Sequence, residues 1–146
     1  MDESNDPASF VAKLAAATNA HDLDALVGCF ADGYVNETPI HPSQGFTGAE
    51  QVRRNWTQLF AGIPDLRAHV LSIAVDRNLV WSEWELSGTR RDGAPQLLRG
   101  VNIFTVAEGR ATSARFYLEP VEQSGVDADW AAARVATPDT RPLPRP

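Results

Sequence analysis

The chain has 146 residues, of which 43% are hydrophobic and 22% are charged. This length and composition are typical of one globular domain with a core of its own. The formal net charge of -6 argues against a nucleic-acid surface or an anionic membrane surface, because both need clustered Lys and Arg. We therefore expect neither nucleic acid nor a membrane as a partner.

Cysteine and histidine are scarce. The single cysteine, Cys29, cannot form an internal disulfide, and the three histidines show no spacing that is typical of metal ligands. No apolar run approaches the roughly 20 residues of a membrane span, and the first residues, MDESNDP, are acidic where a signal peptide would be basic. These features predict a soluble cytoplasmic protein that uses neither a metal nor another cofactor.

The first part of the chain has the apolar periodicity of helices. Asp6 and Pro7 form an N-cap and first-turn pair, and an apolar stripe at helical spacing follows them up to Thr18. Asp22 can cap a second, short helix whose apolar positions continue to Phe30, and Gly33 marks its exit.

A third helix has clear signals at both ends. Thr47 and Glu50 form a capping box, and apolar residues repeat at helical spacing up to Gly62. Between the second and third helices, residues 34–38 can form a short strand, and the prolines and glycine that follow predict a loop.

After Pro64 the pattern changes to strands. Four segments are rich in Val, Ile, Leu and aromatic residues, and the turns between them are short enough for antiparallel hairpins. The four segments cover residues 66–76, 79–89, 96–106 and 111–121. Helices followed by a meander of strands predict an α+β fold, in which the helices pack on one face of a bent sheet.

We expect the folded domain to cover residues 1–124 and to be followed by an extension over residues 125–146. In this extension, DADWAAARV can form a short helix. The closing TPDTRPLPRP has too little apolar surface to pack, which predicts a flexible tail.

Four stretches of the chain carry a resemblance to a known family. In order, they are GCFADGYVNETP, GFTGAEQVRRNW, WELSGTRRDG and GVNIFTVAEGRATSARFY. Together they resemble the SnoaL-like branch of the NTF2-like superfamily over about residues 8–121. The resemblance implies a cone-shaped α+β barrel in which three N-terminal helices and a strongly curved, mainly antiparallel sheet enclose one pocket, usually in a homodimer. Cyclases, isomerases, hydrolases, dehydratases and non-catalytic binding proteins share this fold, so the pocket residues must indicate the function.

Two enzyme types within the superfamily suggest site residues. In proteins that resemble limonene-epoxide hydrolase, the residues that hold and activate a water correspond here to Glu83, Glu85 and Glu119. The first of these positions is an Arg in that family, so Arg99 or Arg115 would have to supply the guanidinium from a neighbouring strand.

In ketosteroid isomerase, the protonated Asp that stabilises the oxyanion corresponds to Asn102. The base and the tyrosine donor fall on Thr38 and Leu14, which cannot perform those roles. The comparison therefore disfavours steroid isomerisation by that mechanism.

The segment ARFYLEPVE alternates between two faces. Arg115, Tyr117 and Glu119 share one face, and Phe116 and Leu118 share the other. Both enzyme comparisons place the polar face in the cavity, so we expect Phe116 and Leu118 to face outward or into a dimer contact.

The resulting prediction is a small, cofactor-independent enzyme that performs acid–base chemistry on an apolar small molecule such as a polyketide-type metabolite. Glu119 would carry the proton, with its pKa raised by enclosure in the pocket. Tyr117 and Asn102 would orient a ligand oxygen, and Arg115 would stabilise charge. The catalytic candidates are Glu119, Glu85, Arg115 and Tyr117, and the substrate-binding candidates are Glu37, Trp56, Glu83, Arg99 and Asn102.

Two alternatives remain at this point. Glu85 and Glu119 together could activate water in a hydrolase, or the protein could be a non-catalytic ligand-binding or dimerisation module. His41 lies in a Pro-rich loop, where most histidines are simply exposed.

Overall fold

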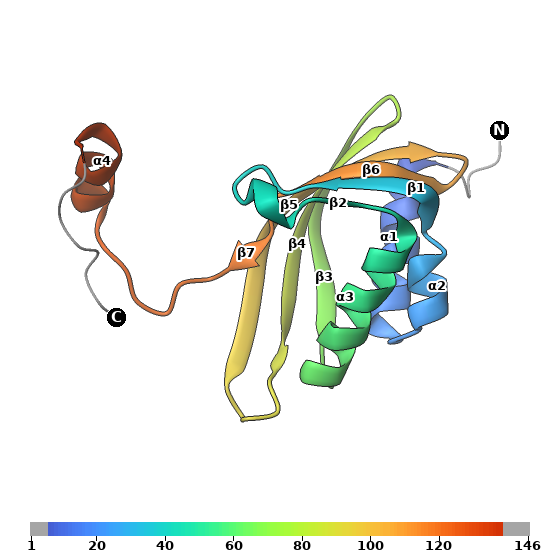
Figure 1. The fold of residues 1–146 in the computed structure, drawn as a ribbon, viewed down its shortest axis with the longest axis horizontal. Helices are drawn as coiled ribbons and strands as arrows, with labels where there is room; N and C mark the ends of the chain where they lie inside the picture. Colours follow the sequence, from blue (N-terminus) through green and yellow to red (C-terminus); the bar gives the residue numbers. More distant parts are fainter. Residues whose placement is uncertain (1–5, 139–146) are drawn as a thin grey trace.

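The computed structural model describes residues 6–138 of the chain, and its elements follow the predicted order of helices and then strands (Figure 1). In chain order, these elements are α1 (Pro7–Asn19), α2 (Leu23–Val27), β1 (Phe30–Glu37), the 3-10 helix η2 (Pro42–Gln44), β2 (Phe46–Thr47), α3 (Ala49–Gly62), β3 (Arg67–Asp76), β4 (Leu79–Thr89), β5 (Pro95–Ala107), β6 (Arg110–Phe116), β7 (Glu119–Pro120) and α4 (Ala128–Ala136).

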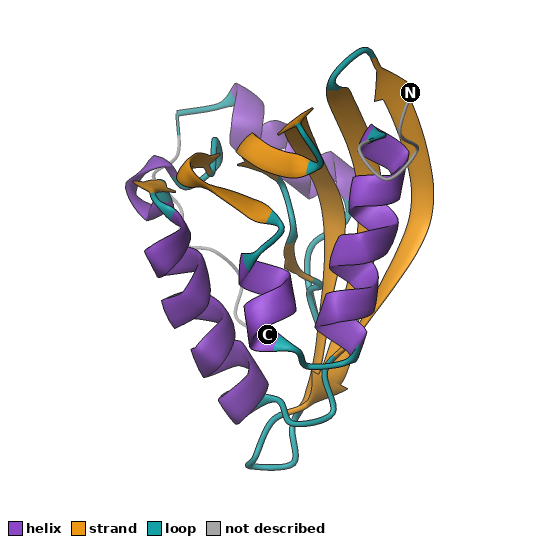
Figure 2. Ribbon diagram, turned by 90° about the vertical axis from the view of Figure 1, so that its right-hand side faces the viewer, coloured by secondary structure: helices purple, strands orange, loops and turns teal. Residues whose placement is uncertain are grey.

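The strands form one curved, seven-stranded sheet in the order β2-β1-β6-β5-β4-β3, with β7 paired to β5. The pairs are antiparallel except for β1 and β6, which run parallel. Helices α1, α2 and α3 stand on one side of the long strands (Figure 2). The predicted α+β architecture is thereby confirmed, and we call the side of the sheet that the helices cover its inner face.

Helix α1 begins as its sequence predicts and carries the core. The Ala8 N–H donates to Asp6 Oδ1 at 3.1 Å, and Pro7 occupies the first turn. The ring of Phe10 then packs edge-on against Phe104 of β5, with 5.0 Å between the ring centroids. Phe10 and Phe104 are both almost completely buried, so this contact fixes α1 to the sheet.

The second helix is shorter than predicted. It ends at Val27, and Phe30, expected as its last apolar position, instead opens β1 opposite Ala111 of β6. Phe30 is 4% exposed and packs against Tyr34 on the same strand, with 4.7 Å between ring centroids. Burial against the sheet therefore outweighs the helical spacing, and Gly33 lies inside the strand rather than at a helix end.

The capping box predicted for the third helix does not form. The N-cap of α3 is Gly48, with a φ of 103° and no side-chain cap. Thr47 cannot act as the cap because it pairs with Val35 in the short strand β2. The helix itself still runs to Gly62, as expected.

The last predicted strand is divided in two. Strands β6 and β7 both pair with β5. In the segment between β6 and β7, the Tyr117 N–H donates to the Val101 carbonyl at 2.9 Å. Gly100 allows the segment around Tyr117 to approach β5 this closely, because a Cβ at that position would lie 2.0 Å from the Tyr117 carbonyl oxygen.

The predicted short helix of the C-terminal extension is confirmed as α4. The Trp130 N–H donates to Asp127 Oδ1 at 2.9 Å, which caps the helix, and α4 stands away from the other elements (Figure 1). The predicted flexible tail falls mostly on residues 139–146, which lie outside the described residues. Among the helices that the structure describes, none is long and apolar enough to cross a membrane.

The close approach at Gly100 generates a stability prediction. Gly100→Ala should lower the free energy of unfolding by about 2 kcal/mol or more, because the backbone of Tyr117 must move away from the new methyl group. Gly33→Ala is the matched control, since no atom lies within 4 Å of a Cβ at Gly33. Urea unfolding of both variants measures the difference, and equal stabilities would contradict the predicted clash.

Candidate active site

The main cavity lies between α3 and the inner face of the sheet and has a volume of about 620 Å³. This is within the range of small-molecule sites, which span roughly 300–1,000 Å³. Much of its wall is apolar or aromatic, and the residues that dominate this part are Trp56, Leu59, Leu86, Leu98, Phe116 and Leu118.

The orientation expected for the segment ARFYLEPVE is wrong. Phe116 pairs with Asn102 of β5, and both residues face inward with Leu118. Arg99 pairs with Glu119 on the opposite face. Because side chains alternate along a strand, packing Phe104 of β5 under α1 turns the polar face of this segment away from the cavity.

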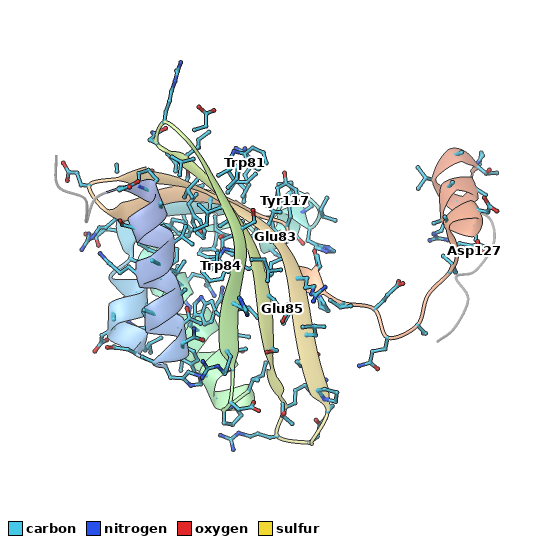
Figure 3. The ribbon with its side chains drawn as sticks, turned by 180° about the vertical axis from the view of Figure 1, so that it is seen from behind. Trp81, Glu83, Trp84, Glu85, Tyr117 and Asp127 are labelled. Carbon is cyan, nitrogen blue, oxygen red and sulfur yellow. The ribbon has the colours of Figure 1, made fainter. Side chains whose placement is uncertain are left out.

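The same alternation places most predicted site residues outside the cavity. On β4, Trp84 lies toward the helices, whereas Glu83 and Glu85 lie on the other side of the strand (Figure 3). None of the following lines the cavities found among the described residues: Glu37, Glu83, Glu85, Arg99, Arg115, Tyr117 and Glu119. The expectation that they enclose a ligand is therefore corrected.

Arg99 and Glu85 form an ion pair on the outer face of the sheet. Arg99 Nε donates to Glu85 Oε2 at 2.7 Å, and the Glu85 side chain is 23% exposed. The Arg99 guanidinium therefore neutralises the Glu85 carboxylate outside the cavity.

Two predicted ligand-binding residues do lie at the cavity. Trp56 of α3 lines it and packs against Phe60, with 5.5 Å between ring centroids. Asn102 of β5 lines a smaller recess that adjoins it. These two are the predicted site residues that the fold brings together around the enclosed space.

A polar wall that the sequence analysis missed runs along β1. The Tyr34 hydroxyl donates to Asn36 Oδ1 at 2.7 Å, and Asn36 Nδ2 donates to Thr38 Oγ1 at 3.3 Å. All three residues line the cavity. Burial raises the pKa of Tyr34, so its phenol stays protonated and remains a hydrogen-bond donor.

Helix α3 contributes a second polar wall through a chain of hydrogen bonds. Arg54 donates to Gln51 Oε1 at 2.6 Å, and Gln51 Nε2 donates to Asn55 Oδ1 at 2.8 Å. Gln51 and Asn55 line the cavity one helical turn apart. Gln51 and Asn55 directly precede Val52 and Trp56 of the same helix, and this spacing is the sequence signal that could have identified them as lining residues.

A histidine–carboxylate pair lies outside the cavity, close in the chain to residues that line it. His41 Nε2 lies 2.7 Å from Glu119 Oε1, and both side chains are about two-fifths exposed, at 43% and 41%. His41 lies in the loop between Thr38 and Ser43, which line the cavity, and Glu119 follows Leu118, which also lines it. The loop gives no local sequence signal for this pairing, because the two residues are far apart in the chain.

The cavity wall is electrically neutral at pH 7. Among its described lining residues there is no Asp, Glu, His, Lys or Arg. Within residues 6–138, no three His, Cys, Asp or Glu side chains gather in a way that could hold a metal ion. Such a wall favours an uncharged ligand, because an ion would lose its hydration without gaining a partner.

Comparison with known proteins places this geometry in context. The family model described as a SnoaL-like domain matches residues 11–114. IdmH, a proposed polyketide cyclase from Streptomyces antibioticus, is 23% identical, with a TM-score of 0.68 over 77% of this chain and 91% of that one. A proposed isomerase from Bacillus subtilis is 18% identical, with a TM-score of 0.70 over 82% and 90%.

A third structure, a proposed polyketide cyclase from Sinorhizobium meliloti, is 24% identical, with a TM-score of 0.59 over 76% of this chain and 94% of that one. These structures share the fold of this chain. No curated protein sequence matches it.

The buried phenol of Tyr34 predicts a pH dependence of stability. The ordinary pKa of a tyrosine is about 10. Above this pH the unfolded chain releases the phenol proton of Tyr34, whereas the folded state keeps it. The protonated phenol therefore contributes fully to the free energy of unfolding below pH 10. Above pH 10 this free energy falls by about 1.4 kcal/mol per pH unit.

Urea unfolding at pH 9, 10 and 11 measures this loss. Tyr34→Phe should flatten the fall above pH 10 and, at pH 7, cost about 1 kcal/mol through the lost bond to Asn36. An identical pH dependence in the variant and the wild type would contradict the burial of this phenol.

Proposed function

Because the chain belongs to the SnoaL-like domain family, we propose that it is a small enzyme that moves a proton next to a carbonyl group of an uncharged, largely apolar small molecule, without a cofactor. Cyclisation or isomerisation of a polyketide-type metabolite is the reaction class. The close contact between His41 Nε2 and Glu119 Oε1, beside residues that line the cavity, is the observation that carries the proposal.

The pair defines which histidine nitrogen can act as the base. Glu119 Oε1 lies 2.7 Å from His41 Nε2, and a carboxylate beside Nε2 favours the neutral-ring tautomer that carries the proton on Nε2. The lone pair is then on Nδ1, which is the atom that takes a proton from the substrate carbon. Glu119 orients the ring and stabilises the imidazolium that forms, so the proton carrier is the pair rather than Glu119 alone.

The substrate oxygen needs a donor when it gains negative charge. Asn55 Oδ1 already accepts from Gln51, which in turn accepts from Arg54, so the amide nitrogen of Asn55 is the group left to donate. The Arg54 guanidinium polarises this chain of bonds and strengthens the donor at its end. After the carbon–carbon bond forms, or the double bond shifts, His41 returns its proton to the product.

Deuterium exchange into 2-tetralone in D2O, followed by 1H NMR, tests this proposal without knowledge of the natural substrate. The wild type should accelerate loss of the protons next to the carbonyl. Glu119→Gln should slow the exchange about 100-fold, and His41→Gln at least as much, because general-base catalysis is worth roughly that factor or more. Binding of 2-tetralone should change less than about threefold.

Glu122→Gln is the matched control, since it removes a nearby exposed carboxylate of the same chain. Its exchange rate should equal that of the wild type. Full exchange activity in both His41→Gln and Glu119→Gln would rule out the pair as the proton carrier.

A non-catalytic binding protein is the second candidate, and the neutral wall of the cavity favours it. It predicts that 2-tetralone binds to the wild type without any accelerated exchange. The hydrolase alternative receives no such support, because Glu85 is ion-paired to Arg99 on the outer face.

A further inference from the structure

A small recess adjoins the main cavity and ends at Asn102. It has a volume of about 30 Å³ and shares Phe30, Trp56 and Phe116 with the wall of the main cavity. Thr18, Trp84 and Asn102 line the recess but not the main cavity. A space of this size accommodates one hydroxyl group or one water molecule, but no ring.

Asn102 brings an unpaired acceptor into this recess. The residue is 4% exposed, and its Oδ1 has no hydrogen-bond partner within the described part of the chain. Buried polar atoms are almost always paired, because leaving one unpaired costs the full price of its desolvation. This oxygen is therefore an exception that needs a physical reason.

The neighbouring side chains cannot supply the missing donor. Ser82 Oγ donates to the backbone carbonyl of Asn102 at 2.7 Å, and Trp84 Nε1 donates to Ser82 Oγ at 2.7 Å. Thr18 Oγ1 donates to the Leu14 carbonyl at 2.8 Å. Each of these three donors is committed to another acceptor, so the partner of Asn102 Oδ1 must enter from the main cavity.

We propose that this partner is a neutral hydroxyl group of the ligand, carried on a ring that lies between Trp56 and Phe116. A cation does not fit, because the described wall of the recess offers no carboxylate to pair with it. A carbonyl does not fit against Oδ1 either, because two acceptors would face each other. The ligand class is thus a phenol or an enol whose hydroxyl enters first, and this inference rests on the proposed use of the main cavity.

The bound molecule then has a defined orientation in the cavity. The hydroxyl end contacts Asn102, and the rings fill the aromatic part of the cavity. The remaining oxygens then lie toward Asn36, Thr38 and Asn55, on the polar walls. Asn102 is a positioning residue in this arrangement, since it orients the ligand relative to the His41–Glu119 pair.

Two probes of similar shape test the inference. 2-Naphthol carries the hydroxyl donor, and 2-fluoronaphthalene carries none. Dissociation constants follow from 19F NMR titration of 2-fluoronaphthalene and its competition by 2-naphthol. The wild type should bind 2-naphthol about tenfold more tightly, and Asn102→Leu should remove this preference by weakening 2-naphthol alone.

The melting temperature of ligand-free Asn102→Leu should also rise, because an unpaired buried oxygen is replaced by an apolar group of similar volume. Thr112→Val is the matched control: it removes a hydroxyl that donates to the Thr105 carbonyl outside the recess, and the tenfold preference should persist.

Equal binding of both probes by the wild type would overturn the inference and would indicate a fixed water on Asn102. This measurement needs no variant and decides the question even if Asn102→Leu does not fold. A preference that persists in Asn102→Leu would overturn it as well. Deuterium exchange into 2-tetralone reports on the proposed function separately, because 2-tetralone has no hydroxyl group in its keto form.

Discussion

The contact between Phe10 of α1 and Phe104 of β5 is the constraint on which the rest of the structure depends. Phe104 is fully buried beneath the helix, with ring centroids 5.0 Å apart. Since strand side chains alternate, fixing Phe104 inward also fixes the inner face of each neighbour through the register. Trp84 and Phe116 then line the enclosed space, and the charged residues between them are left on the outer face.

This separation of apolar and charged faces determines what chemistry the protein can support. Carboxylates enclosed beside Trp84 and Phe116 would lose hydration without finding a cation, at a cost of several kcal/mol each. The fold avoids that cost by pairing Glu85 with Arg99 and Glu119 with His41 outside the cavity. The described cavity wall is uncharged, and these ion-paired carboxylates lie where water still reaches them.

The sequence predicted the architecture well but not the face of the sheet that holds the site. Periodicity and the cap at Asp6 located α1, because these signals are local. The segment around Phe116 has large side chains on both faces, so its alternation alone could not show which one faces inward. His41 was missed for a similar reason: its partner Glu119 is adjacent only after β7 has paired with β5. Within residues 6–138, Asn102 Oδ1 is unpaired because the neighbouring donors bond to other acceptors, and the sequence alone does not show those bonds.

A crystal structure of the complex with 2-naphthol tests the central claim, that the inner apolar face rather than the outer polar face is the ligand site. The account predicts the rings between Trp56 and Phe116, with the hydroxyl within hydrogen-bond distance of Asn102 Oδ1. Density for the ligand against Glu83 or Arg115 on the outer face, with the cavity left unchanged, would contradict it.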